Sequence, residues 1–126
     1  MRLLLDTVAF IMAAKSPERL SPRTLREILN TDNSRELSSI SVTEIATKEA
    51  TGKLAFTKQD FLQTVADLRV RLLPFTSEHA LALFDLPLHH RDPFDRQIIA
   101  QALVENIPIL TCDAVFGLYT DLKVIW

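Results

Sequence analysis

The sequence contains little of several residue types, and each shortage excludes a class of protein. Cys112 is the single cysteine, so the chain forms no internal disulfide, and a reduced thiol in the cytosol is the plain expectation. Two glycines and six prolines leave little material for flexible linkers. The formal net charge of -2 excludes coating of nucleic acid by overall attraction, while a local basic groove stays open. No apolar run is long enough to span a membrane.

What remains is the composition of one small globular domain. The 126 residues suit a single domain covering 1–126, and 48% hydrophobic residues supply a sizeable core. The N-terminal apolar stretch is interrupted by Asp6, and a secretion signal avoids a charge in that region. We therefore expect a cytoplasmic protein.

Short apolar runs alternate with helical patterns along the chain, which predicts an α/β fold around a parallel sheet. Helices are expected from Thr7, from Pro22 after the cap Ser21, from Ser41, from Thr57, from Thr76 or Ser77, and from Asp92-Pro93. Ser41 with Glu44 three residues later is a capping-box pattern. The strand candidates are 3–5, 37–40, 70–75, 108–110 and 124–125.

Four acidic residues occupy equivalent places in this pattern. Asp6 and Asp113 each follow the end of an apolar strand, and Glu44 and Asp95 each fall in the first turn of an expected helix. Strand ends and the following helix starts share one edge of a parallel sheet, where open α/β sheets bind ligands. Converging carboxylates with no Cys or His cluster indicate Mg²⁺, with Mn²⁺ as a substitute, and such an ion supports phosphodiester hydrolysis.

Each carboxylate also has a structural interpretation. Acidic residues near helix starts stabilise the helix dipole, and Glu44 and Asp95 could simply complete caps. Asp6 is harder to explain in this way, because a charge directly after a buried strand is unusual unless it is paired or bound to metal.

Five segments of the chain resemble the conserved blocks of PIN-domain proteins, and in particular of VapC-type toxins. The most specific of them is Asp92-Pro93-Phe94-Asp95-Arg96. The segments, in order along nearly the whole chain, are Arg2–Thr7, Ser41–Lys48, Gly52–Leu54, His90–Arg96 with Ala100–Ala102, and Ile109–Asp113 with Phe116 and Tyr119. Thr43 and Cys112 depart from the family, where Trp and Arg respectively are common.

The resemblance implies a three-layer α/β/α PIN-like fold with a central, mainly parallel sheet of four or five strands. It also implies a Mg²⁺-dependent endoribonuclease, the toxin of a type II toxin–antitoxin pair, with a cognate antitoxin and a homodimeric state. The family's metal-binding and catalytic carboxylates carry over to Asp6, Glu44, Asp95 and Asp113. Asp6 and Asp95 are then the direct ligands, and Glu44 and Asp113 complete the site.

Four neighbouring side chains are candidates for contacts with the RNA substrate. Lys48 lies four residues after Glu44, in the favourable orientation for a helical ion pair, and either orients Glu44, touches a phosphate or forms a plain surface pair. Arg96 either contacts phosphate or pairs with Asp92. Thr7 and Thr111 either bind ligand groups through their hydroxyls or cap backbone groups.

The histidines and two other classes of function complete the hypotheses. His89 and His90 lack the further His or Cys ligands of a histidine metal site, which favours a surface or capping role. A catalytically silent PIN-like module that only binds RNA or protein is the main alternative function. A phosphorylated receiver domain has a similar length, but Asp6 is followed by Thr7 rather than by a second acid.

Overall fold

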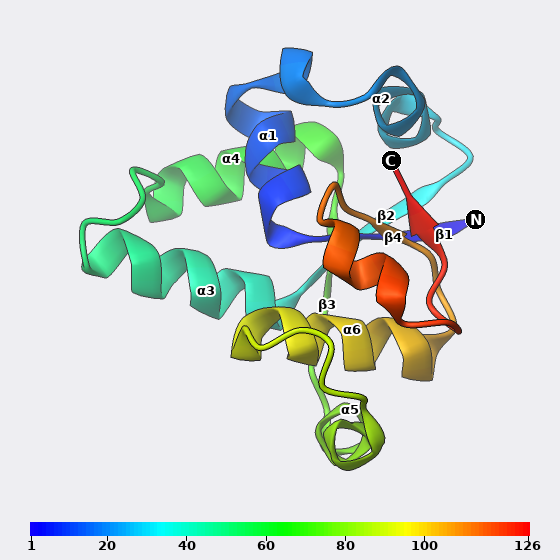
Figure 1. Ribbon diagram of the computed structural model, residues 1–126. Helices are drawn as coiled ribbons and strands as arrows, with labels where there is room; N and C mark the ends of the chain where they lie inside the picture. The colour runs from blue at the N-terminus through cyan, green and yellow to red at the C-terminus, as the bar shows by residue number, and fades with distance from the viewer.

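The computed structural model describes residues 1–126 as a five-stranded sheet flanked by helices (Figure 1). All strand pairs are parallel, and the spatial order is β3-β2-β1-β4-β5. The strands are β1 (Arg2–Leu5), β2 (Ser34–Ser38), β3 (Arg71–Leu73), β4 (Ile109–Leu110) and β5 (Val124–Ile125). The α-helices are α1 (Thr7–Lys15), α2 (Pro22–Leu29), α3 (Ser39–Ala50), α4 (Lys58–Leu68), α5 (Ser77–Leu81) and α6 (Pro93–Glu105). Short 3₁₀ helices are η1 (Pro17–Arg19), η2 (Ala82–Asp85) and η3 (Ala114–Leu118).

The central strand β1 divides the core into two halves. Leu3 and Leu5 point to one side, where they pack with residues of α1, α2 and α4, while Leu4 points to the other side, against α6 and η3. All three leucines are fully buried. This alternation is the pleat of a strand covered on both faces, and it confirms the predicted α/β fold with a parallel sheet.

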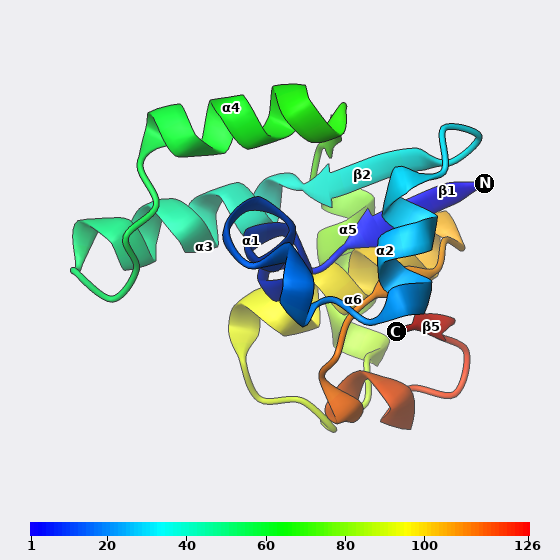
Figure 2. The same cartoon turned by 90° about the horizontal axis from the view of Figure 1, so that it is seen from above.

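Two views show how the helices cover the sheet. In Figure 1, α1 and α4 lie above the sheet and α6 with α5 lies below it, and Figure 2 shows α3 and α4 running side by side. Figure 1 also shows that α1, α3 and α6 begin on the same side of the molecule. None of the helices combines the length and apolar character needed to cross a lipid bilayer.

The predicted second strand and its following helix are wrong in their bounds. The strand is β2, Ser34–Ser38, rather than 37–40, and it includes the buried Glu36, whose charge is paired with Arg2 at 2.6 Å. The next helix begins at Ser39 with Ser38 as its cap, so Ser41 and Glu44 form no capping box. Glu44 therefore lies in the second turn of α3, three positions further from the helix start than expected.

The third strand is shorter than the predicted 70–75. It covers Arg71–Leu73 and pairs only with β2, as the edge of the sheet. Pro74 follows, and its missing N–H prevents further pairing. The predicted helix before Pro87 also divides into α5 and the tighter η2.

Candidate metal centre

The acidic residues predicted from the sequence are held at the carboxyl edge of the sheet by local backbone geometry. Asp6 caps α1, since its Oδ1 accepts the Ala9 N–H at 2.7 Å, and its own N–H donates to the Leu110 carbonyl at the end of β4. Asp113 caps η3 by accepting the Val115 N–H at 3.0 Å. The side chain of Asp6 is almost fully buried.

Asp95 lies in the first turn of α6. Its backbone N–H donates to the side chain of the cap residue Asp92 at 3.0 Å. The Asp95 Oδ2 and the Asp113 Oδ2 each lie 3.0 Å from Nε2 of His90. Ligand atoms of these three residues all lie within 4.8 Å of one another, which is close enough for one ion.

Glu44 enters the site from α3 as a buried side chain with one unsatisfied oxygen. Its Oε2 accepts a 2.6 Å ion pair from Lys48, as the i,i+4 spacing predicted. Its Oε1 is buried and has no hydrogen-bond partner. A buried carboxylate oxygen without a partner is costly, and a cation ligated by that oxygen would remove the cost.

The pKa values show that the carboxylates act on one another. The pKa of Asp6 is raised to about 6, mainly by burial; hydrogen bonds from Thr111 and Ala9 lower it, and the charges of Asp113 and Glu44 raise it.

The pKa of Asp95 is also raised, to about 7, mainly by burial and then by repulsion from Asp92, Glu44 and Asp6, while His90 lowers it. Four segments distant in sequence therefore share one electrostatic environment. The group with ligand atoms all within 4.8 Å consists of Asp95, Asp113 and His90, while Asp6 and Glu44 are linked to it through their charges. The four carboxylates offer the oxygen ligands that a hard divalent cation prefers.

The predicted substrate contacts have different local partners. The hydroxyl of Thr7 donates to Ser41 at 2.9 Å inside the protein and ties α1 to α3. Thr111 is buried, and its hydroxyl accepts the Asp113 N–H at 3.1 Å. Arg96 donates to the carbonyls of Pro87 and Leu86 rather than to Asp92, so it fastens the loop before α6.

His90 is the site residue that sequence reasoning missed. The count of His and Cys ligands argued against it, but its partners are the carboxylates themselves. The usable signal was its position five residues before Asp95, at the start of the same acidic block.

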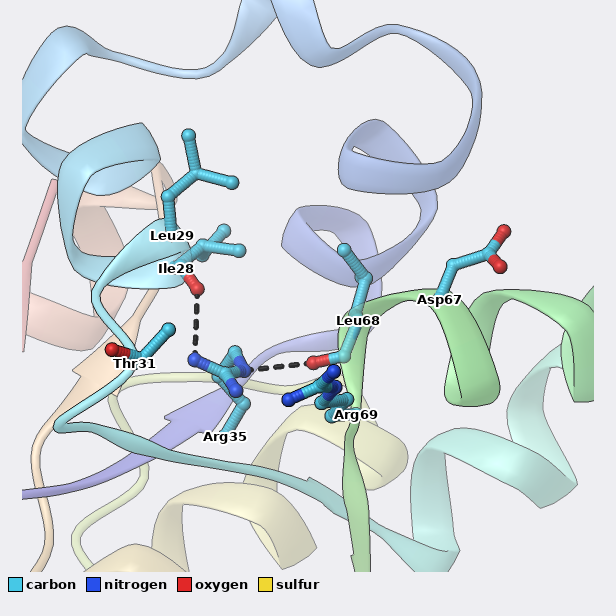
Figure 3. A pocket seen from close by; sticks show the side chains of 7 residues that line it. All are labelled: Ile28, Leu29, Thr31, Arg35, Asp67, Leu68 and Arg69. Atoms are coloured by element: carbon cyan, nitrogen blue, oxygen red, sulfur yellow. Dashed lines mark hydrogen bonds between the residues drawn. The ribbon is translucent and has the colours of Figure 1, made fainter.

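A hollow lies at the opposite, amino-terminal end of β2. It has a volume of about 260 Å³ and is lined by Ile28, Leu29, Thr31, Arg35, Asp67, Leu68 and Arg69 (Figure 3). Figure 3 shows the Arg35 guanidinium between the ends of α2 and α4, where it donates to the Ile28 and Leu68 carbonyls at 3.1 and 2.7 Å. In this hollow Arg35 therefore links the carboxyl-terminal ends of α2 and α4, and there is no cluster of acidic residues.

Comparison with known proteins agrees with this architecture. The family model described as PIN domain matches residues 3–121. No curated protein matches the sequence.

Similar solved structures include a chain of VapBC2 from Rickettsia felis bound to a DNA fragment from their promoter, with a TM-score of 0.75, 19% identity, and coverage of 99% of this chain and 98% of that one. A chain of DNA-bound VapBC from Salmonella typhimurium gives a TM-score of 0.72 at 18% identity over 99% and 97%. A chain of FitAcB from Neisseria gonorrhoeae gives 0.64 at 22% identity over 98% and 96%.

Proposed function

Because the chain belongs to the PIN-domain family, we propose that it is a divalent-metal-dependent endoribonuclease and the toxin of a toxin–antitoxin pair. The observation that carries the proposal is that Asp95 and Asp113 have ligand atoms within 4.8 Å of each other, at the sheet edge where burial, with added repulsion among the carboxylates, raises the pKa values of Asp6 and Asp95. Such a cluster is unfavourable in the metal-free protein, because its charges repel one another, and it becomes favourable around a cation.

Each carboxylate has a defined part in this proposal. Asp6, Asp95 and Asp113 would hold Mg²⁺ or Mn²⁺, and the partnerless Oε1 of Glu44 would ligate it directly or through water. When bound, the ion supplies Lewis-acid polarisation of a phosphate and a water of lowered pKa.

The remaining polar groups would orient the site and its substrate. Lys48 pairs with Glu44 and is the side chain we assign to a phosphate contact, since it is partly exposed. The buried hydroxyl of Thr111 acts through Asp6, whose pKa it lowers. Thr7 acts through Ser41, and Arg96 through the loop that carries His90.

RNA is the substrate class that the resemblance to VapC-type toxins implies. RNA is polyanionic, so an acidic centre binds it only with a cation present, and single-stranded loops are favoured because their backbone can be splayed out. We assign no particular RNA.

The experiment compares wild type, Asp95→Asn and the matched control Asp67→Asn, a conversion on the exposed end of α4. Each is expressed in a bacterial host, and RNA is sequenced from its 5′-phosphate ends. Purified proteins are then tested with Mg²⁺, Mn²⁺ and EDTA. We expect growth arrest and defined cuts from wild type and Asp67→Asn only. RNA binding without cleavage under every cation would instead assign a silent binding module.

We also propose that an apolar segment of the antitoxin occupies the groove between α3 and α4. The groove encloses about 450 Å³ and is lined mainly by apolar side chains, including Val42, Ile45, Phe61, Leu62 and Leu72. Leu62 is 55% exposed and Leu72 46% exposed, which is unusual for leucines lining one concave surface. An amphipathic helix fits such a groove.

A homodimer is a further part of the proposal, tested by the mass of the purified protein in solution.

A further inference from the structure

His90 joins two carboxylates that belong to separate parts of the chain. Its Nε2 lies 3.0 Å from Asp95 Oδ2 on α6 and 3.0 Å from Asp113 Oδ2 at the start of η3. Carboxylate oxygens accept hydrogen bonds when ionised. The Nε2–H group of His90 hydrogen-bonds the Asp113 carboxylate, and the Asp95 carboxylate lies at the same distance from that nitrogen. The ring therefore sets the spacing between α6 and the chain beyond β4.

The other ring nitrogen decides which tautomer is present. Nδ1 of His90 lies 3.1 Å from the backbone nitrogen of Asp92, and a backbone N–H only donates. Nδ1 must therefore offer its lone pair, and the proton of the neutral ring is on Nε2. A metal ion on Nε2 would require the proton on Nδ1, which would place two donors face to face.

The backbone and the ring of His90 are also fixed by contacts with Tyr119 and Phe116. The His90 backbone N–H donates to the Tyr119 hydroxyl at 2.9 Å, and that hydroxyl donates to the Pro87 carbonyl at 2.9 Å. The ring meets Phe116 edge-on, with centroids 5.6 Å apart. With its side chain 14% exposed, the ring has little freedom to turn away from the carboxylates.

We propose that His90 is a positioning residue of the metal centre and not a ligand. It holds the Asp95 and Asp113 carboxylates at the separation that one cation requires, through an Nε2–H group fixed by the Asp92 backbone. The inference rests on the proposed function, because it concerns the same centre. Groups that hydrogen-bond ligating side chains typically change metal affinity by about 10- to 100-fold when removed.

Two substitutions separate the two sides of the ring. Gln places its amide nitrogen where Nε2 lies, so His90→Gln keeps a donor to both carboxylates. Asn is shorter, so His90→Asn keeps an acceptor for the Asp92 N–H but loses the bridge. His89→Gln is the control, since His89 is an exposed neighbour outside the acidic site.

Binding of Mn²⁺ alone to each purified full-length protein is measured by calorimetry, with no RNA present. We expect His89→Gln to match wild type, His90→Gln to remain within about threefold, and His90→Asn to bind about 10- to 100-fold more weakly. A His90→Asn protein that binds Mn²⁺ as tightly as wild type, or more tightly, overturns the proposal.

The tautomer is tested separately by long-range ¹H–¹⁵N correlation spectra of the metal-free wild type. We expect the proton on Nε2, and a proton on Nδ1 overturns the proposal even if the variants fail to fold. The readouts also separate the two claims. Unchanged Mn²⁺ affinity of His90→Asn beside an active wild type refutes the role of His90 alone, whereas a wild type that binds no Mn²⁺ and cuts no RNA refutes the nuclease.

Discussion

Replacing Asp6 by Asn should make the metal-free protein more stable at neutral pH, although Asp6 is a proposed catalytic residue. The change removes a buried charge and keeps the geometry around it. Asn caps helices about as well as Asp, so the bond from the Ala9 N–H to the side chain of residue 6 survives.

The size of the effect follows from the pKa of Asp6. A rise from 3.8 to about 6 corresponds to about 3 kcal/mol of unfavourable free energy for the charged form of a nearly fully buried group. The new amide NH₂ lacks a partner and offsets about 1 kcal/mol of this gain. Asp6→Asn should therefore raise the free energy of unfolding by about 2 kcal/mol at pH 7.5, an increase in Tm of about 5 to 10 °C.

The pH dependence has a definite sign. Because the folded-state pKa values of Asp6 and Asp95 lie above those of the unfolded chain, the folded protein binds more protons between about pH 4 and 7. Their contribution to stability is fully present below the unfolded pKa and is lost as the pH rises through about 6 and 7. Wild type in EDTA should therefore lose stability across this window, and at pH 5, where Asp6 is mostly protonated, Asp6→Asn should gain less than about 1 kcal/mol.

The assay is urea unfolding in EDTA at pH 5 and pH 7.5 for wild type, Asp6→Asn and the control Asp67→Asn. Adding Mg²⁺ at pH 7.5 should stabilise wild type and not Asp6→Asn, because only the ionised set binds the cation. An Asp6→Asn protein no more stable than wild type at pH 7.5 would refute the electrostatic reasoning, and an equal gain at both pH values would assign the effect to packing.

Three further predictions concern other contacts. Lys48→Met leaves the buried Glu44 without its cation and should lower the free energy of unfolding, measured in urea, by about 1 to 3 kcal/mol. Adding Glu44→Gln should restore part of this loss. Arg35→Met removes donors to carbonyls at the ends of α2 and α4 and should cost about 2 to 3 kcal/mol while RNA cleavage persists, and an unchanged unfolding midpoint would contradict this. Leu62→Asp should leave stability unchanged but weaken capture of the proposed antitoxin, co-expressed with this chain, by about tenfold or more, and an undiminished complex in pull-down would exclude the groove.

The alternation of strands and helices could be predicted because apolar periodicity and caps are local signals. Leu3 to Leu5 forms a fully buried run, and Ser21-Pro22 and Asp92-Pro93 are helix starts that need no tertiary information. The placement of Asp6 and Asp113 beyond strand ends followed from the same signals.

The errors arose where distant partners override local patterns. Ser34-Arg35-Glu36 is too polar to indicate a strand, yet Glu36 is buried because Arg2 neutralises it across the β1–β2 pair. Ser41 looked like a cap because three serines precede or occupy the helix start, and only the fold reveals that Thr7 binds Ser41 instead. The role of His90 was equally hidden, since its bridge depends on Asp113, 23 residues away.

The position of β1 between β2 and β4 has a consequence for biosynthesis. Asp6 and Glu44 leave the ribosome early, but Asp95, Asp113 and β4 are made only within the last third of the chain. The main-chain bond from Asp6 to Leu110 closes only when that late segment docks beside the first strand. A nascent polypeptide or a fragment ending before residue 90 therefore carries half of the carboxylates and cannot assemble the centre, so the proposed metal site forms only after Asp113 has been synthesised.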